Sequence, residues 1–131
     1  MKKIIAFILS IILFFAGLLF PSDIANTKWE LMAWSVSSVE PTEYTMTLTL
    51  DKDTFSGRSA VNLYGGGYSA IGERLILSGI WSTKMAGPPE AMQAEQIYFE
   101  LLGQVKKYTV TASALTLLDE NSNELLIFEK A

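Results

Sequence analysis

Two periodicities of apolar residues divide the chain. In residues 44–51, YTMTLTLD, the apolar Met46, Leu48 and Leu50 alternate with threonines. A period of two predicts a strand with one buried face, and β-branched threonine suits the outer face. In residues 90–105 the apolar residues recur instead at spacings of one and three. This pattern predicts one amphipathic helix. Its apolar stripe consists of Ala94, Ile97, Tyr98, Leu101, Leu102 and Val105.

The predicted helix has suitable residues at both ends. Pro88 and Pro89 fit the first turn, where a missing N–H costs nothing, and Glu90 fits its positive end. Lys106 and Lys107 are expected at the negative end. The polar residues of the helix should face solvent. This set consists of Gln93, Gln96, Glu100 and Gln104, with Glu95 also expected to be solvated.

Further strands are predicted on both sides of the helix. About five precede it and about three follow it, within residues 28–34, 44–51, 58–70, 74–81, 107–112, 114–119 and 124–129. Residues 21–27 form a polar linker, and ENSN at 120–123 forms a hairpin turn. No strand–helix–strand alternation occurs, so a parallel sheet is not expected. The prediction is a mainly β fold: a partly open antiparallel barrel or curled sheet of about 7–8 strands with one packed helix.

The N-terminal segment differs from the rest of the chain. Residues 4–20 carry no charge and follow Lys2 and Lys3. This pattern is typical of a secretory signal peptide, but it also reaches the lower limit of about 17 residues for a spanning helix. Residues 1–25 are therefore either a cleaved signal peptide or an N-terminal membrane anchor, and residues 26–131 form the domain. Either alternative predicts export to the periplasm or cell envelope, with residues 4–20 in the membrane if uncleaved.

Composition narrows the possible partners. Of 10 basic residues, Lys2 and Lys3 precede the domain, as does Asp23 of the 14 acidic residues, so residues 26–131 carry 8 basic and 13 acidic residues, a net charge of −5. This balance argues against nucleic acid as a partner. The chain has no cysteine, which excludes disulfides and lipidation, and we expect a monomer stabilised by its core alone.

The most unusual stretch is FSGRSAVNLYGGGY at residues 55–68. It lacks the second glycine and the lysine of a phosphate-binding loop. A dinucleotide fingerprint also fails, because a strand follows where that fingerprint needs a helix. The stretch instead predicts a bent hairpin in which Gly65–Gly67 form the bend, with Tyr64 and Tyr68 packed beside it.

No residues qualify as a catalytic, cofactor-binding or metal site. Histidine and cysteine are absent, which removes the usual zinc sites and nucleophilic triads. The oxygen-rich stretches at Asp51–Asp53 and 119–124 fit polar turns better than calcium loops, and Ser82-Thr83-Lys84 lacks the Ser-x-x-Lys spacing. We therefore expect no cofactor and no enzymatic activity. The tryptophans should pack in or near the core. They are Trp29, Trp34 and Trp81.

Several motifs together resemble the META-domain (HslJ-like) family. The most specific is Thr83-Lys84-Met85-Ala86, followed by a proline and the amphipathic helix. The resemblance spans residues 28–129. Its other parts are Trp29-Glu30-Leu31, the stretch from Gly57 to Tyr68, Glu95-Gln96 to Leu102, and Leu115-Thr116-Leu117-Leu118.

The resemblance implies structural roles and two departures. The family's two motif cysteines fall on Val61 and Gly87, and their joint loss is expected if the two positions normally lie close and pair. Asn62 is implied to cap backbone groups, Gly66 to need a special backbone angle, and Met85 to lie in the core. The family implies a β domain with one helix, no known catalysis, and association with heat shock and novobiocin resistance in the bacterial envelope.

Three functional hypotheses follow. The first is a non-catalytic, stress- or antibiotic-tolerance-related envelope domain that binds a protein or envelope component. The alternative is a barrel that binds a small hydrophobic, lipid-like ligand, and the third is a hydrolase using carboxylates. A filled core with an exposed apolar patch would favour the first hypothesis. An internal cavity would favour the second, and two buried carboxylates facing one cleft would favour the third.

Overall fold

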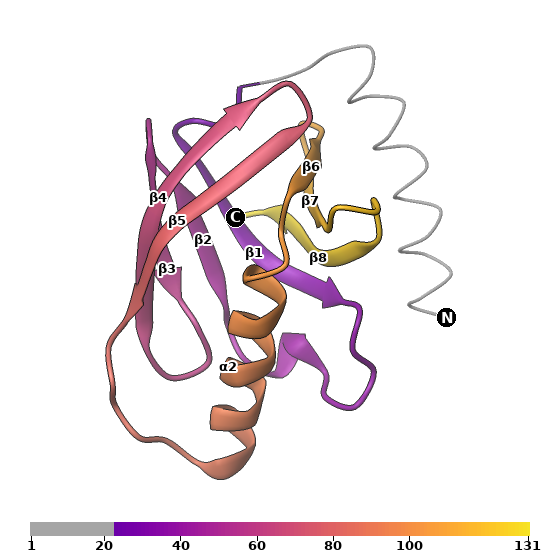
Figure 1. The fold of residues 1–131 in the computed structure, drawn as a ribbon. Coiled ribbons are helices and arrows are strands. Elements are labelled where there is room, and N and C mark those ends of the chain that lie inside the picture. The colour runs from indigo at the N-terminus through magenta and orange to yellow at the C-terminus, as the bar shows by residue number, and fades with distance from the viewer. Residues whose placement is uncertain (1–22) are drawn as a thin grey trace.

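The computed structural model describes residues 23–131 (Figure 1). The predicted hydrophobic helix at residues 4–20, and with it most of the predicted segment 1–25, lies outside the described residues. The elements in chain order are β1 (Thr27–Trp34), the short 3-10 turn η1 (Pro41–Glu43), β2 (Thr47–Leu50), β3 (Thr54–Arg58), β4 (Leu63–Ile71), β5 (Arg74–Ser82), α2 (Pro89–Leu102), β6 (Lys107–Val110), β7 (Ala114–Leu118) and β8 (Glu124–Lys130).

The eight strands form one closed ring in chain order. Each strand runs antiparallel to the next, and β8 returns to pair with β1. The mainly β antiparallel prediction, its strand number and its single packed helix are therefore confirmed. The joint between β5 and β6 is short. It consists of the pair Arg74–Lys107 and two flanking backbone hydrogen bonds, from Leu75 N–H to Lys106 and from Tyr108 N–H to Glu73.

Large apolar side chains fill the inside of the ring. Met46, Leu48 and Leu50 point inward as the alternating pattern predicts. The intervening threonines 47 and 49 are only partly covered. The bulkiest fully buried side chains are Trp29, Phe55, Tyr64, Tyr98 and Phe128. Ile24, in the segment predicted to be a linker, also belongs to the core, so that prediction was wrong at this residue.

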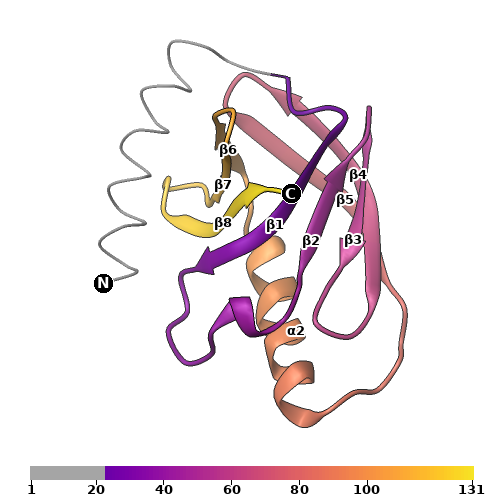
Figure 2. The same ribbon diagram turned by 180° about the vertical axis from the view of Figure 1, so that it is seen from behind.

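Helix α2 closes one end of the ring (Figure 2). The predicted apolar stripe faces the core through Ala94, Tyr98, Leu101 and Leu102. Pro89 begins the helix, as predicted. The last turn holds no basic residue, because the helix ends at Leu102 and Lys107 already belongs to β6. None of the helices within residues 23–131 is long and apolar enough to cross a bilayer.

The glycines Gly65–Gly67 lie inside β4 and not at a bend, which corrects the prediction. The chain reverses at residues 59–62 instead, between β3 and β4. Gly66 has no positive φ. It is required for space, because an added Cβ would lie 2.7 Å from the carbonyl oxygen of Ser78 and 2.8 Å from the ring of Phe55. Gly79, opposite on β5, has φ +57° and forms the bulge that shifts the register here.

Candidate functional site

A buried carboxylate joins α2 to the loop between β3 and β4. Glu95 is only 5% exposed. Its Oε1 accepts hydrogen bonds from the hydroxyl of Ser59 and from the backbone N–H groups of Val61, at 3.0 Å, and Asn62, at 2.7 Å. Its Oε2 accepts from the Asn62 amide at 2.6 Å. The loop at 59–62 is thus wrapped around one carboxylate, which we call the Glu95 centre.

Asn62 extends the Glu95 centre to the segment before the helix. Its Oδ1 accepts from the hydroxyl of Thr83 at 2.8 Å and from the N–H of Met85 at 2.7 Å. Its Nδ2 also donates to the carbonyl of Met85 at 3.1 Å. The Asn62 side chain therefore both accepts from and donates to the backbone of Met85, as the backbone of a neighbouring strand would. This agrees with the backbone-capping role implied by the family resemblance.

The electrostatics of the Glu95 centre favour the ionised carboxylate. Burial alone would raise the pKa of Glu95, but the hydrogen bonds donated by Ser59, Asn62 and Val61 outweigh it and hold the pKa below its usual value. A carboxylate with a lowered pKa and both oxygens engaged is a weak base. Its geometry suits a structural anchor better than proton transfer.

Two tyrosine hydroxyls are also buried where α2 packs against the barrel: those of Tyr98 on α2 and Tyr64 on β4. The hydroxyls of Tyr64 and Tyr98 lie 2.5 Å apart, and Tyr64 also donates to the carbonyl of Thr47 at 2.6 Å. Burial raises the pKa of both tyrosines. Both therefore stay protonated at neutral pH and serve to pack the rings, which meet edge to face.

The two positions that carry cysteines in the family pattern are in contact. A Cβ built on Gly87 would lie 3.5 Å from the Cβ of Val61 and 2.7 Å from its Cγ2. Disulfide-linked residues have Cβ atoms about 3.5–4.5 Å apart. The expectation that these positions lie close together is therefore met, and Val61 fills the space that a disulfide would occupy.

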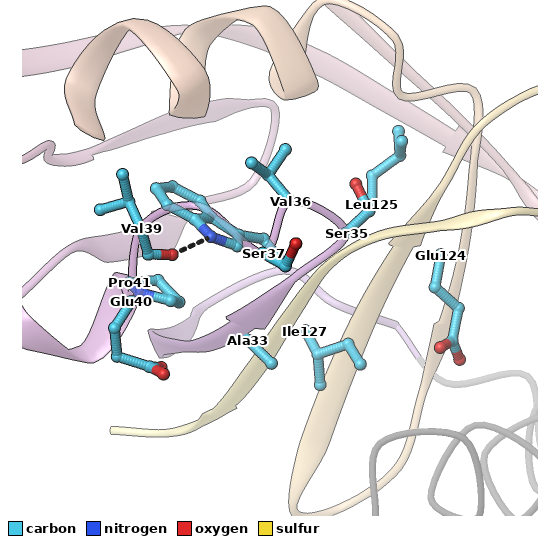
Figure 3. Close-up of a pocket in the computed structure, with 11 residues that line it drawn as sticks. Ala33, Ser35, Val36, Ser37, Val39, Glu40, Pro41, Glu124, Leu125 and Ile127 are labelled. Atoms are coloured by element: carbon cyan, nitrogen blue, oxygen red, sulfur yellow. Dashed lines mark hydrogen bonds between the residues drawn. The ribbon is translucent and has the colours of Figure 1, made fainter. Parts of the chain in front are cut away.

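A groove of about 340 Å³ lies on the outside of the barrel, between β1, β8 and the loop after β1 (Figure 3). Its walls are mainly apolar, and the indole N–H of Trp34 donates to the carbonyl of Val39 at 2.9 Å. Glu40 lies toward one end and Glu124 toward the other (Figure 3). The remaining apolar wall consists of Ala33, Val36, Pro41, Leu125 and Ile127.

Glu124 at the end of this groove contrasts with Glu95. Its Oε2 is buried and has no hydrogen-bond partner among the described residues. Burial raises the pKa of Glu124 to about 7. Near neutral pH this carboxyl is therefore divided between its neutral and charged forms. The sequence pattern did not single it out, because it sits at the start of a strand next to a polar turn.

A third feature is a set of exposed apolar side chains on β4 and β5. Trp81 is 51% exposed, and its ring lies over Gly65, where an added Cβ would meet it at 2.8 Å. Leu63 lies two residues before Gly65 on the same strand. We call the exposed apolar set in β4 and β5 the β4–β5 strip. Its members are Leu63, Ile76, Ile80 and Trp81.

Several predicted positions need correction. Glu95 was expected to be solvated but is buried. Trp81 and Met85 were expected in the core but are half exposed or more, with Met85 64% exposed. A signal for Glu95 was present: it lies four residues after Ala91 and three before Tyr98, both buried on the same face of α2.

The remaining residues that the sequence analysis considered as candidate site residues do not form one common site. Asp119 accepts hydrogen bonds from the N–H groups of Asn121 and Asn123, both at 2.9 Å, so its carboxylate is engaged within the turn. Trp29 is buried and Trp34 packs against the core, as predicted. Lys84 points to solvent, while Thr83 next to it binds Asn62.

The comparisons with known proteins agree with this architecture. The META domain family matches residues 22–131. A solved structure of a protein from Burkholderia xenovorans has a TM-score of 0.70 and 25% identity, covering 88% of this chain and 86% of that one. A second NMR structure has a TM-score of 0.60 and 19% identity, covering 80% and 89%, and shows the fold alone. No protein with a curated description matches significantly. The family match covers most of the sequence, and the chain belongs to the META domain family.

Proposed function

We propose that this protein is a non-catalytic, exported binding domain of the bacterial envelope that acts through a protein or envelope partner. The observation behind the proposal is a barrel filled with aromatic side chains that leaves the β4–β5 strip exposed. Tryptophan is enriched among the hot spots of protein interfaces, and exposed apolar side chains mark candidate interaction sites. Export is supported by the apolar residues 4–20 that follow Lys2 and Lys3.

The ionisable groups support a non-catalytic role. Glu95 is buried with its hydrogen bonds satisfied, and Glu124 lies on the opposite side of the ring, so no two buried carboxylates among residues 23–131 face one cleft. General acid–base catalysis by a carboxylate pair needs both groups within reach of one substrate. A role in tolerance of stress or antibiotics is proposed only through family membership.

The test is chemical crosslinking in envelope preparations, followed by capture of the protein. Trp81→Ala should abolish capture of the partner bound by the unchanged protein. Ile71→Ala is the matched control, because Ile71 is an apolar side chain 71% exposed at the β4–β5 turn, outside the strip. Equal capture by both variants, or no specific partner for the unchanged protein, would reject the proposal. Equal unfolding free energies for the two variants would show that the loss is not due to misfolding.

A second candidate function is binding of a small hydrophobic molecule in the groove of Figure 3. Its apolar walls favour such a ligand, and its volume is within the range of small-molecule sites. Trp34 in the wall should report occupancy through its emission. A long-chain fatty acid should give a saturable change that Val36→Glu removes, and a chain that shows no saturable change has no such site.

A further inference from the structure

Strand β5 has one free backbone edge over most of its length. Its joint with β6 consists of the pair Arg74–Lys107 and two flanking hydrogen bonds, one of which runs from the Leu75 N–H to Lys106. The residues before Lys106 come from the end of α2 and are not a strand, so the ladder stops there. In both views β5 runs away from β6 after this joint (Figures 1 and 2). In the described part of the chain, the backbone of residues 76–82 has hydrogen bonds to β4 only.

The known pairings fix which backbone groups of β5 face the free edge. In an antiparallel ladder the N–H and C=O groups of successive residues point alternately to the two sides of the strand. The Leu75 N–H points to β6, so the N–H and C=O of Leu77 point to the same side. At the other end, the Thr83 N–H donates to Leu63 before β4 turns inward, so the N–H of Ser82 points away from β4. The edge therefore presents donors and acceptors over about six residues, or roughly 20 Å.

The sequence of this edge lacks most of the features that protect free strand edges. Natural edge strands commonly carry proline or charged side chains, which prevent another strand from adding. Residues 75–83 read LILSGIWST and contain neither. Their one protective feature is the bulge at Gly79. Residues 78–81 are all exposed, with Ile80 42% and Trp81 51% exposed. The edge is therefore accessible to another polypeptide.

A hollow of about 570 Å³ lies between the end of β5 and α2. Its wall includes Ser82 and Met85 on one side and Met92 and Phe99 of α2 on the other. Met85 is 64% exposed. Methionine side chains adapt to the shape of the apolar groups that bind to them. The hollow thus gives a segment bound at the edge a place for one further side chain.

An extended segment of a partner fits this edge better than a second copy of the chain. Antiparallel pairing of two β5 edges, centred on the free part, would bring Arg74 of each copy close to Lys84 of the other. Each domain also carries a net charge of −5. Like charges at both ends disfavour that pairing. Lys84 is exposed and has no ion pair among the described residues, so it suits a partner segment with an acidic residue at this end.

We propose that an extended segment of a partner protein adds to the free edge of β5 as a further strand. Its backbone pairs with Leu77 and Ser82, and its side chains lie beside Ile80 and Trp81 of the β4–β5 strip. Strand addition gives affinity through main-chain hydrogen bonds and specificity through side-chain contacts. The proposal rests on the proposed function, because it states how the partner of the β4–β5 strip is held.

The test uses a synthetic ten-residue peptide in which valine and threonine alternate between two terminal glutamates. Amide hydrogen exchange, measured by NMR, should slow by about tenfold or more at Leu77 and Ser82 when the peptide is saturating. Two modified peptides, N-methylated on one or the other set of alternate residues, separate strand addition from side-chain contact. An added strand is paired along one edge only, so one modified peptide should bind and the other should not.

Two variants test the same edge from the side of the protein. Ile80→Lys places a charge on the edge and should weaken peptide binding by about tenfold or more. Ile71→Lys is the matched control, since Ile71 is 71% exposed at the turn before β5, and should leave binding unchanged. Equal unfolding free energies of the two variants would show that both are folded.

The outcomes separate this proposal from the proposed function. Capture of an envelope partner that depends on Trp81, with no slowing of exchange at Leu77 and Ser82, would overturn strand addition and leave the proposed function standing. Strand addition without any captured partner would reject the proposed function alone. Equal binding of both methylated peptides would also overturn the proposal. Slow exchange at the two amides without peptide, in a chain that is dimeric, would overturn it by showing that a second copy occupies the edge.

Discussion

Glu95 and Glu124 are two poorly hydrated carboxyl groups on opposite sides of one small barrel, and they behave in opposite ways. Glu95 receives hydrogen bonds from Ser59, Val61 and Asn62, and its pKa is lowered. Glu124 has an unpaired oxygen, and burial raises its pKa. The difference lies in the neighbouring backbone: a loop wraps around Glu95, whereas Glu124 faces apolar walls.

The contrast separates a structural carboxylate from one that can respond to its surroundings. The Glu95 centre ties α2 to the β3–β4 loop and to residues 83–85, so its removal should affect the whole fold. Glu124 Oε2 has no hydrogen-bond partner among the described residues. The free-energy cost of burying this carboxyl group therefore changes with pH and with the groups that cover it. Four variants test and refine this comparison.

The largest effect is expected from Glu95→Leu. The change leaves three N–H groups of residues 61 and 62 without an acceptor, while the Ser59 hydroxyl can still donate to the carbonyl of Asn62. It should cost about 3–5 kcal/mol of unfolding free energy. Urea unfolding measures it. Glu100→Leu is the control, since Glu100 is exposed on the same helix and should change stability by about 0.5 kcal/mol or less.

The Glu95 effect should also depend on pH in a defined direction. Because folding lowers the pKa of Glu95, its contribution is fully present above the ordinary value of 4.5 and is lost as pH falls through the folded value. Glu95→Leu should therefore flatten the acid side of the stability profile. An unchanged acid side would show that other carboxylates dominate there.

The next effect is a gain from joining residues 61 and 87. Val61→Cys with Gly87→Cys should form a disulfide on oxidation, because the two Cβ positions lie 3.5 Å apart. Closing this loop should raise the unfolding free energy by roughly 3 kcal/mol relative to the reduced form. Denaturant unfolding with and without reductant measures the gain. Free thiols that persist after oxidation would contradict the geometry.

A smaller gain is expected from Glu124→Leu. Folding raises the pKa of Glu124, so the unfolded chain loses this proton first, and stability falls as pH rises from 4.5 to about 7. After allowance for screening by solvent, the variant should be more stable by about 1–2 kcal/mol at pH 8. The same pair compared at pH 4.5 is the control and should differ little. An equal gain at both pH values would mean that packing and not charge is responsible.

The smallest effect is expected from Thr116→Val. Valine has nearly the same shape and removes the unpaired hydroxyl, so the variant should be equal in stability or up to about 1 kcal/mol more stable. Thermal unfolding beside Thr49→Val, a partly covered threonine of β2, measures the difference. Destabilisation of Thr116→Val alone would show that the hydroxyl does have a partner.

Periodicity predicted most of the fold but little of the Glu95 centre. Alternation assigned the inward residues of β2, and the one-and-three spacing assigned the buried side of α2. The prediction failed at Glu95: a charged side chain was expected to be solvated, although it lies between apolar positions of the helix and is buried in the structure. Its burial depends on a loop more than thirty residues away in sequence, and short-range patterns cannot register such a partner.

Glycine and tryptophan show the same limit. Gly65–Gly67 suggested a bend, but Gly66 serves to make room for the ring of Phe55 across the sheet. Trp81 was expected in the core by its size, yet it is 51% exposed, and its ring occupies the space that a side chain at Gly65 would fill. Each outcome is set by a residue on the adjacent strand.

Strand β1 pairs with β2 on one side and with β8 on the other. The second backbone edge of residues 27–34 is therefore paired only when residues 124–130 have been made and have folded against it. Contacts that span nearly the whole sequence form late and slowly. Until the last strand is in place the sheet has an open side, and its unpaired early edges would be the sites where a folding helper, or a neighbouring copy, could bind.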